Sequence, residues 1–244
     1  MDLPVRGAVV LLRSGGCRGA TTPASAVSIG TVIETVVFDV GETLTRDDRY
    51  WTSWADWLDV PRHTLAALVG AVTVQGRDNA DALRLVRPGI DVRSEYAARE
   101  AAGQGEQLTE EDLYDDVRPT LAGLRKLGIR VIVAGNQTRK VGELLRALKL
   151  PADLVITSGE WGVAKPSTAF FERVLEVADA APHETVYVGD HPANDVYPAK
   201  AVGLRAAHLR RGPWGYLWAD DPQVAATADW RIDSLTQLTS LIAE

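Results

Sequence analysis

A short apolar run that ends abruptly on a carboxylate limits the folds open to this 244-residue chain more than any other stretch. The run Val36-Val37-Phe38 is followed directly by Asp39 and then by the turn residue Gly41. A short apolar run bounded by turn residues is typical of a β-strand that is covered on both faces. Asp39 is therefore expected at the carboxyl end of a buried strand, where open α/β sheets bind ligands. From these residues alone, an aspartate that merely opens a turn is an equally good interpretation.

Strand and helix patterns alternate from residue 109 to the end of the chain. A helix is expected to begin at Thr109, whose hydroxyl can cap it, and to carry an apolar face from Leu113 to Leu127. Strands are expected at residues 129–134, 154–157, 185–188, 205–209 and 230–232, the last of them at an edge, with helices between them. This alternation predicts an α/β fold with a Rossmann-like parallel sheet and helices on both faces.

Residues 46–108 differ from the rest because they contain helical patterns and no strand pattern. Trp51, Trp54 and Trp57 recur every three residues, so on a helix they form one aromatic stripe. The stripe is expected to pack this segment against itself or the core, and the alternative is that one or two rings line a pocket. We therefore expect a core made of residues 31–45 and 109–244, and a small helical cap domain made of residues 46–108.

Composition excludes several classes of protein. The formal net charge of −7 offers no basic surface for nucleic acid or an anionic membrane, so neither partner is expected. With one cysteine, Cys17, the chain cannot form an internal disulfide, and a cytoplasmic setting is the simplest interpretation. No apolar stretch approaches the roughly 18 residues that a membrane-spanning helix needs. A monomer or a homodimer is expected.

Residues 1–30 are rich in small and polar residues without periodicity, which predicts a flexible N-terminal extension. A secretion signal is the alternative, although Arg13 interrupts an apolar segment that is already short for one. A third hypothesis places the start of translation near Val32. The intact mass of the natively expressed protein would test it.

Polar residues follow three of the expected strands directly. Asp39 follows the first, Gly135 and Asn136 follow the second, and Asp190 and Asp195 follow the fourth. The carboxyl ends of parallel strands lie at one edge of a sheet, so these residues are expected to converge. Clustered carboxylates repel one another, and Mg²⁺, which prefers oxygen ligands, is the natural neutralising ion.

Lys165 lies in a loop that leads into a helix, within the sequence Gly162-Val163-Ala164-Lys165-Pro166. A fixed ammonium there could hold a phosphoryl oxygen or pair with a carboxylate at a strand end. A solvated surface lysine is the alternative. The run from Arg210 to Gly215 is expected to form a surface turn, with an arginine clamp for an anionic substrate as the alternative. His191 directly follows Asp190 and is expected in a surface loop, with a place near the pocket as the alternative.

In this order, four motifs resemble those of the haloacid dehalogenase (HAD) superfamily of hydrolases and phosphotransferases: FDVGETL, VIVAGNQ, WGVAKP and VGDHPAND. The resemblance covers residues 33–243, with a helical cap inserted after the first motif. It implies that Asp39 is a nucleophile that becomes an aspartyl phosphate. It also implies that Mg²⁺ is bound by Asp39, Asp190 and the backbone carbonyl of Gly41, and that Asp195 supports the metal-bound water or the lysine.

The resemblance further implies that Lys165 stabilises charge between the nucleophile and the phosphoryl group, and that Asn136 helps to orient that group. The turn after Asp39 can aim the backbone N–H groups of residues 40–43, Thr43 among them, at the phosphoryl oxygens. Gly135 occupies the phosphate-binding position at which the superfamily usually has serine or threonine. Donors that could replace it are Asn136, Gln137 and Thr138.

Gly41 is the other departure from the superfamily pattern. Phosphatases of the superfamily usually carry a second aspartate there, which protonates the leaving group and later activates water. General acid–base catalysis of this kind contributes roughly 10² to 10⁴ in rate. Glu42, Asp47 or Asp48 could substitute for the missing aspartate.

The sequence therefore predicts a Mg²⁺-dependent phosphatase, a phosphoric monoester hydrolase whose partner is a small phosphorylated molecule. Gly41 and Gly135 favour an alternative, a catalytically silent relative that keeps the fold as a binding or regulatory protein. A 2-haloacid dehalogenase or a phosphonate hydrolase that uses Asp39 is a further alternative. The presence of both Asp190 and Asp195 favours a metal enzyme over a metal-free dehalogenase.

Overall fold

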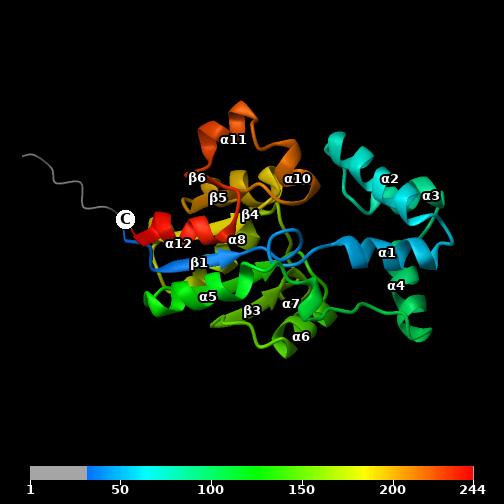
Figure 1. Ribbon diagram of the computed structural model, residues 1–244, viewed down its shortest axis with the longest axis horizontal. Helices are drawn as coiled ribbons and strands as arrows, with labels where there is room; N and C mark the ends of the chain where they lie inside the picture. The colour runs from blue at the N-terminus through cyan, green and yellow to red at the C-terminus, as the bar shows by residue number, and fades with distance from the viewer. Residues whose placement is uncertain (1–31, 244) are drawn as a thin grey trace, which may run out of the picture. The chain divides into compact units, whose positions relative to one another are not determined.

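The computed structural model describes residues 32–243, and these residues contain one six-stranded parallel sheet (Figure 1). The strand order is β3-β2-β1-β4-β5-β6, which places β1 between β2 and β4. From β1 the chain adds β2 and β3 on one side and then β4, β5 and β6 on the other, and such a switch point in strand order is where α/β sheets bind ligands. The bounds are Thr35–Phe38 (β1), Arg130–Gly135 (β2), Leu154–Thr157 (β3), Thr185–Gly189 (β4), Arg205–Leu209 (β5) and Trp230–Ile232 (β6).

Helices cover both faces of this sheet. In β1, Val36 and Phe38 join one apolar cluster and Val37 joins another, because successive strand residues point to opposite faces. Residues of α5 (Val117–Lys126), α6 (Arg139–Ala147) and α12 (Leu235–Ala243) belong to the first cluster, and residues of α8 (Thr168–Ala178) and α9 (Tyr197–Ala201) to the second. The α/β fold with helices on both faces is confirmed.

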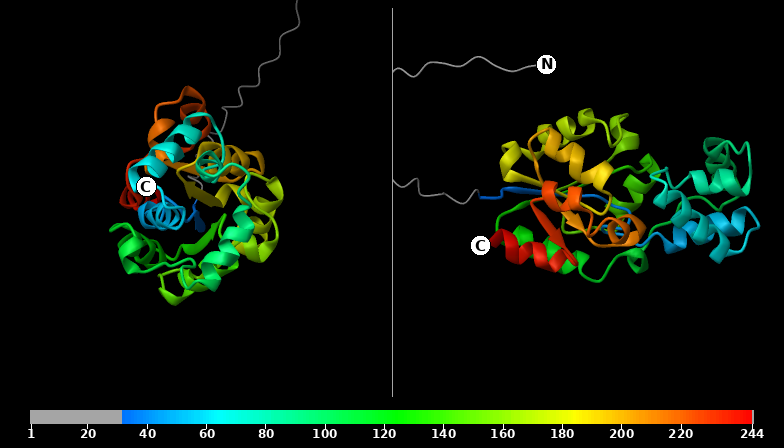
Figure 2. Two further views of the ribbon diagram at one scale, coloured as in Figure 1. Left: turned by 90° about the vertical axis from the view of Figure 1, so that its right-hand side faces the viewer. Right: turned by 90° about the horizontal axis from the view of Figure 1, so that it is seen from above.

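A helical insertion follows β1 and precedes β2. It contains α1 (Asp48–Trp57), α2 (Arg62–Val74), α3 (Asp81–Val86) and α4 (Val92–Ala101), and it lies beyond the carboxyl ends of the strands (Figures 1 and 2). The insertion has its own apolar cluster, with Trp54 fully buried and Trp51 and Trp57 packed against it. The interpretation of the tryptophan stripe as packing is therefore right for this cluster.

Shorter elements complete the described chain. They are the 3₁₀ turns at Glu110–Asp112 (η1) and Pro182–Glu184 (η2), a π-helical turn at Pro192–Val196 (η3), α7 (Ser158–Trp161), α10 (Gly212–Leu217) and α11 (Pro222–Thr227). The division of the chain into segments 31–45, 46–108 and 109–244 stays a prediction, and the predicted flexible extension, 1–30, lies outside the described residues. Within residues 32–243, no helix is long and apolar enough to cross a membrane.

The helix predicted to run from Thr109 to Leu127 is wrong over residues 109–116. Thr109 caps only the 3₁₀ turn η1, and α5 begins at Val117. Between them, Leu113 forms an antiparallel bridge with Thr45, and the N–H of Tyr114 donates to the carbonyl of Leu44 at 3.0 Å. The backbone at this point therefore pairs with the loop after β1 and cannot form helical hydrogen bonds.

Candidate active site

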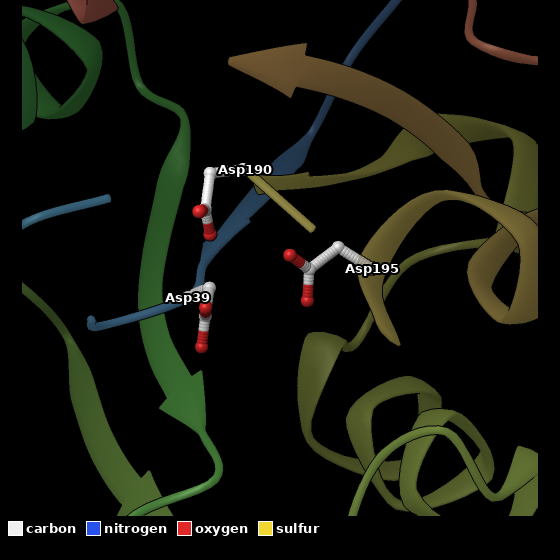
Figure 3. A group of neighbouring side chains, drawn as sticks. All are labelled: Asp39, Asp190 and Asp195. Carbon is white, nitrogen blue, oxygen red and sulfur yellow. The ribbon is translucent and has the colours of Figure 1, made fainter. Parts of the chain in front are cut away.

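Three carboxylates meet at the carboxyl ends of the central strands. Asp39 follows β1, Asp190 follows β4, and Asp195 lies in the turn η3 just beyond (Figure 3). One oxygen of each lies within 4.8 Å of the others, and all three residues are buried. The predicted convergence of these residues is what the fold produces, because β1 and β4 are neighbours in the sheet.

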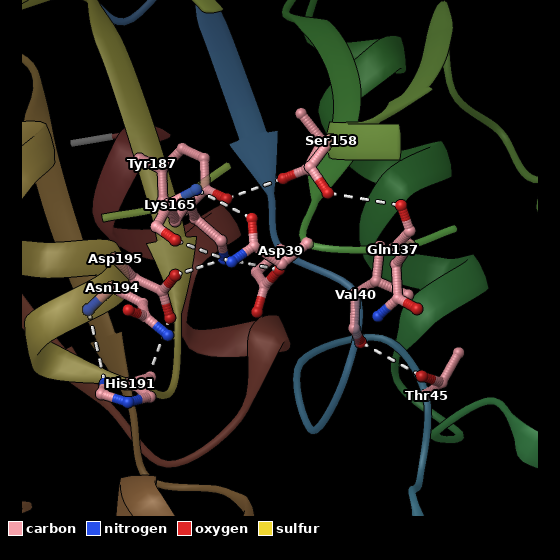
Figure 4. Close-up of polar contacts among 12 residues, drawn as sticks. Asp39, Val40, Thr45, Gln137, Ser158, Lys165, Tyr187, His191, Asn194 and Asp195 are labelled. Carbon is pink, nitrogen blue, oxygen red and sulfur yellow. Dashed lines mark hydrogen bonds and ion pairs between the residues drawn. The ribbon is translucent and has the colours of Figure 1, made fainter. Parts of the chain in front are cut away.

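Lys165 lies among these carboxylates, contrary to the surface alternative. Its ammonium is 2.7 Å from Oδ1 of Asp39 and 2.6 Å from Oδ1 of Asp195 (Figure 4). The side chain is only 2% exposed, so both ion pairs are shielded from water. Lys165 comes from the loop between α7 and α8, and it reaches the site from beside β2.

Asn136 holds the backbone of Lys165 from both sides. Its Nδ2 donates to the carbonyl of Lys165 at 2.9 Å, and its Oδ1 accepts from the N–H of Lys165 at 2.8 Å. This reciprocal pair fixes the point from which the lysine side chain extends. In this structure Asn136 orients Lys165 through that backbone contact.

Asp195 is fixed by the turn η3. Its Oδ2 accepts from the N–H of His191 at 2.9 Å, while its Oδ1 faces Lys165. The carboxylate lies against Gly189, where a Cβ atom would be 2.2 Å from Oδ2 of Asp195. Glycine at the end of β4 is therefore required by this close approach.

Burial dominates the electrostatics of the cluster. Desolvation raises the pKa of Asp39 to about 6, against the opposing effect of the Lys165 ammonium. Burial would by itself lower the pKa of Lys165, but Asp195 and Asp39 raise it well above its ordinary value. Lys165 is therefore a fixed positive charge at neutral pH.

The surroundings of the Asp190 carboxylate indicate whether a cation would fit between the three aspartates. Among the described residues its carboxylate has no hydrogen bond or ion pair, although the residue is only 4% exposed. Burial and the neighbouring Asp195 raise its pKa well above the ordinary value. Three carboxylates facing one ammonium leave negative charge uncompensated, and carboxylate oxygens are the ligands that Mg²⁺ prefers. The donor set fits a hard divalent cation.

The two glycines that depart from the superfamily pattern each lie against a carboxylate. A Cβ atom on Gly135 would be 2.5 Å from Oδ1 of Asp39, so a serine or threonine there would require Asp39 to turn. A Cβ atom on Gly41 would be 3.4 and 3.5 Å from the two carboxylate oxygens of Asp47. Desolvation is the largest cause that raises the pKa of Asp47 well above its ordinary value, and the negative charges of Glu42 and Asp39 raise it further.

Thr43 is one of the predicted site residues that do not line the pocket. Its side chain is fully buried, and its hydroxyl has no hydrogen-bond partner among the described residues. Its carbonyl accepts from Nη1 of Arg211 at 2.7 Å. Gly41 does line the pocket beside Asp39.

Arg211 is buried, so the predicted surface turn is wrong for this residue. Its Nη2 is 2.6 Å from Oδ2 of Asp116, and its guanidinium lies 3.9 Å from the ring centroid of Tyr114. The arginine therefore ties β5 to α5 and to the loop after β1. Because Nη1 and Nη2 both donate to these partners, the guanidinium has no free pair of N–H donors for a substrate anion.

Three residues of the pocket wall differ from the main expectations. Asn79 and Trp214 were not predicted there, and His191 lines the pocket, which was the alternative to a surface loop. His191 stacks on Trp214 with ring centroids 3.7 Å apart, and the indole N–H of Trp214 donates to Oδ1 of Asn79 in the insertion at 3.1 Å. All three line the pocket of about 130 Å³ that contains Asp39 and Lys165. Burial lowers the pKa of His191 to about 4, so its ring is neutral at pH 7. Only a contact between the core and the insertion reveals these residues.

The family model for haloacid dehalogenase-like hydrolases matches residues 33–203, which is more than half of the chain. With its six-stranded sheet, the helical insertion after β1 and the ordered motifs, the chain belongs to this family of hydrolases.

Relatives and solved structures agree with this membership. The haloacid dehalogenase-like hydrolase domain-containing protein 3 of Xenopus laevis is 38% identical over 96 residues, which are 38% of this chain and 39% of the relative. The glyceraldehyde 3-phosphate phosphatase of Methanocaldococcus jannaschii is 32% identical over 132 residues, 53% of this chain and 56% of the relative. The chain thus spans about half the length of the curated relatives it matches.

A HAD hydrolase of Bacillus subtilis, solved bound to magnesium, has a TM-score of 0.65 with this chain. It is 16% identical, and the match covers 87% of this chain and 100% of that one. At this identity the likeness concerns the fold alone.

Proposed function

We propose that this chain is a Mg²⁺-dependent phosphatase that hydrolyses small organic phosphomonoesters through an aspartyl phosphate on Asp39. The observation that carries the proposal is the Lys165 ammonium, held between Asp39 and Asp195 beside the buried carboxylate of Asp190. A carboxylate attacks a phosphate dianion only where cations offset the repulsion between the two. The fixed lysine supplies one such charge, and the remaining carboxylates suit a metal ion.

In this mechanism Asp39 attacks phosphorus, and the ester oxygen leaves with its electron pair. Lys165 stays close to the Asp39 carboxylate and stabilises negative charge on the transferring phosphoryl group. Asn136 positions Lys165 through its two backbone hydrogen bonds. Water then attacks the phosphoryl group and restores the Asp39 carboxylate, as in other covalent mechanisms.

Asp39, Asp190 and the carbonyl of Gly41 would hold the magnesium ion, with Asp195 beside them. When bound, the ion supplies positive charge that draws the phosphoryl oxygens to the nucleophile. Asp195 also keeps Lys165 in place through the 2.6 Å ion pair. Phosphoryl oxygens would lie against the backbone N–H groups of residues 40 and 41, because those of Glu42 and Thr43 already donate to the carbonyls of Thr45 and Val40. The hydroxyl of Thr43 is buried away from the pocket, so the predicted phosphate contact of Thr43 is not part of this proposal.

A small substrate is supported by the cavities near Asp39. A cavity of about 500 Å³ adjoins the smaller pocket, and both are lined by Asp47, Asn136 and Gln137. This volume suits a small organic group attached to the phosphate. The relative from M. jannaschii, by its name, acts on glyceraldehyde 3-phosphate, which is a small phosphomonoester. The state of assembly, a monomer or a homodimer, stays a prediction.

The proposal is tested with p-nitrophenyl phosphate and three samples: the wild type with Mg²⁺, the wild type with EDTA, and Asp39→Asn with Mg²⁺. We expect hydrolysis only in the first sample, with kcat lower by about 10³-fold or more in the variant, because the nucleophile is missing. Thermal unfolding of Asp39→Asn checks that the variant is folded.

Two other outcomes would contradict the proposal. If the wild type with Mg²⁺ does no better than Asp39→Asn, the chain is a binding or regulatory member of its family. If 2-chloropropionate releases chloride without added metal and no phosphate ester is cleaved, the chain is a dehalogenase.

A further inference from the structure

Cleavage of a phosphomonoester leaves a strongly basic oxygen on the departing alcohol, so a proton donor near the ester oxygen accelerates the step. The attacking and leaving oxygens are roughly in line through phosphorus, so the donor must reach the ester oxygen on the side where the substrate's organic group extends. Gly41, two residues after Asp39, offers no side chain for this task. Some other group in the pocket has to supply the proton.

The carboxylate of Asp47 occupies the space next to Gly41. A Cβ atom built on Gly41 would contact Oδ1 of Asp47 at 3.4 Å and Oδ2 at 3.5 Å. Asp47 therefore brings a carboxyl group from another part of the chain to the region that a longer side chain at residue 41 would reach. The turn between residues 41 and 45, closed by a bridge between Gly41 and Thr45, makes this approach possible.

Asp47 is not used as a helix cap. It is the N-cap residue of α1, where an aspartate usually accepts from backbone N–H groups of the first turn, but its side chain makes no such bond. No hydrogen bond or ion pair among the described residues involves its carboxylate. The residue is only partly buried, and it lines the pocket with Asp39 and Lys165.

Asp47 also lines the adjoining cavity of about 500 Å³. It lies where the pocket for the phosphoryl group meets the larger cavity for the organic group. The ester oxygen joins the phosphoryl group to the organic group, so in a bound substrate it would lie in this same region near Asp47.

Three other titratable groups near Asp39 already have partners. Glu42 accepts from the hydroxyl of Tyr114 at 2.5 Å and from the N–H of Asp47 at 3.1 Å. Lys165 is held by two carboxylates. His191 stacks on Trp214, and its Nδ1 faces the N–H of Asn194. The Asp190 carboxylate also lacks a partner among the described residues, but it is assigned to the magnesium ion. Asp47 is then the remaining acidic group that faces the pocket without a partner.

We propose that Asp47 is the general acid–base residue of this site, in place of a carboxyl group at residue 41. This inference rests on the proposed phosphatase function. In the first step Asp39 forms a bond to phosphorus, the bond to the ester oxygen breaks, and that oxygen takes its proton from the Asp47 carboxyl group. In the second step water attacks phosphorus, its proton passes to the Asp47 carboxylate, and the bond from phosphorus to Asp39 breaks.

The experiment compares phenyl phosphate with p-nitrophenyl phosphate in Asp47→Asn, in the presence of Mg²⁺. Phenolate is the stronger base and needs the proton, whereas p-nitrophenolate leaves readily without it. We expect kcat/KM for phenyl phosphate to fall by about 10² to 10⁴ and kcat/KM for p-nitrophenyl phosphate to fall less than about tenfold. Asp48→Asn is the matched control, because it makes the same change one residue away on an exposed side chain.

A second variant keeps the test independent of folding defects. Gly41→Asp should restore phenyl phosphate hydrolysis in the Asp47→Asn background, since a Cβ atom at residue 41 meets only ordinary contacts of 3.4 Å or more. Equal losses for both esters, or no loss for either, would overturn the inference while leaving Asp39 as the nucleophile. If the wild type cleaves neither ester, the proposed function fails and the inference fails with it.

Discussion

Lys165 is held at both ends, at its backbone by Asn136 and at its ammonium by Asp39 and Asp195. The position of a buried charge depends on such contacts, because a long side chain otherwise samples many rotamers. A residue that touches only the backbone of the lysine can therefore control where the charge lies.

Asn136→Ala tests this positioning role. The change removes two hydrogen bonds and leaves the N–H and carbonyl of Lys165 without partners, so we expect a loss of about 1–3 kcal/mol in the free energy of unfolding. We also expect a fall in kcat that exceeds any rise in KM. Urea unfolding and steady-state kinetics with p-nitrophenyl phosphate measure the two effects.

Gln137→Ala is the matched control for stability. The side chain of Gln137 makes no hydrogen bond among the described residues, and its removal should change the free energy of unfolding by no more than about 0.5 kcal/mol. Equal losses in both variants would show that truncation at this loop, and not the contact with Lys165, determines stability.

At the scale of elements, the positions at which strands end explain which site residues could be predicted from the sequence. Asp39 and Asp190 could be placed at the edge of the sheet because buried strands end directly before them. Lys165 could be assigned to the site only through the ordered motifs that resemble the HAD superfamily. The non-helical segment before α5 could not be predicted from the sequence, because it depends on pairing between Leu113 and Thr45, which are 68 positions apart. Local helix signals at Thr109 carry no information about that pairing.

Gly189→Ala should damage the element that holds Asp195. The new Cβ atom would be 2.2 Å from Oδ2 and 2.7 Å from Cβ of Asp195, whose side chain is fixed in the turn η3. We expect the free energy of unfolding to fall by about 1–3 kcal/mol because the site is overpacked. Thermal and urea denaturation of the metal-free protein provide the measurement.

Gly70→Ala makes the same chemical change in a roomy place. Gly70 lies inside α2, and a Cβ atom there would meet nothing within 4 Å. Alanine should stabilise the helix by about 0.5–1 kcal/mol, so the two variants should shift stability in opposite directions. A shift of the same sign in both would contradict the account of Gly189.

At the scale of the whole molecule, the pocket combines two parts of the chain that sequence patterns treat separately. Strand ends in the core supply Asp39 and Asp190, and the insertion supplies Asn79, which contacts Trp214 of the core. Alternation of strands and helices predicts the first set through the rules of parallel sheets. It cannot predict how the insertion packs on the core, so Asn79, Trp214 and the orientation of Asp47 required the structure.

Asp39 contributes stability that the metal-free molecule should lose as the pH rises. Burial raises the pKa of Asp39 from 3.8 to about 6, so the folded state binds more protons than the unfolded state between these values. The resulting stability is present below about pH 4 and is lost as the pH passes about 6. The difference between the two pKa values corresponds to roughly 3 kcal/mol.

Asp39→Asn in EDTA measures this contribution, because asparagine cannot ionise. Relative to the wild type, the variant should gain roughly 3 kcal/mol in unfolding free energy between pH 4 and pH 8. Urea titrations across this range follow the difference. A constant difference between the two proteins would mean that Asp39 ionises in the folded state as easily as in the unfolded chain.

The hydrogen bond from the N–H of Asp47 to Glu42 limits how far the segment after β1 can move relative to the core. Glu42 is anchored to the core through Tyr114, and the neighbouring Arg46 donates to the carbonyls of Glu111 and Leu113. The segment up to residue 47 is thus fastened to the core on both sides. Any movement of the insertion relative to the core would therefore take place beyond residue 47, and Asp47 would keep its position beside Gly41.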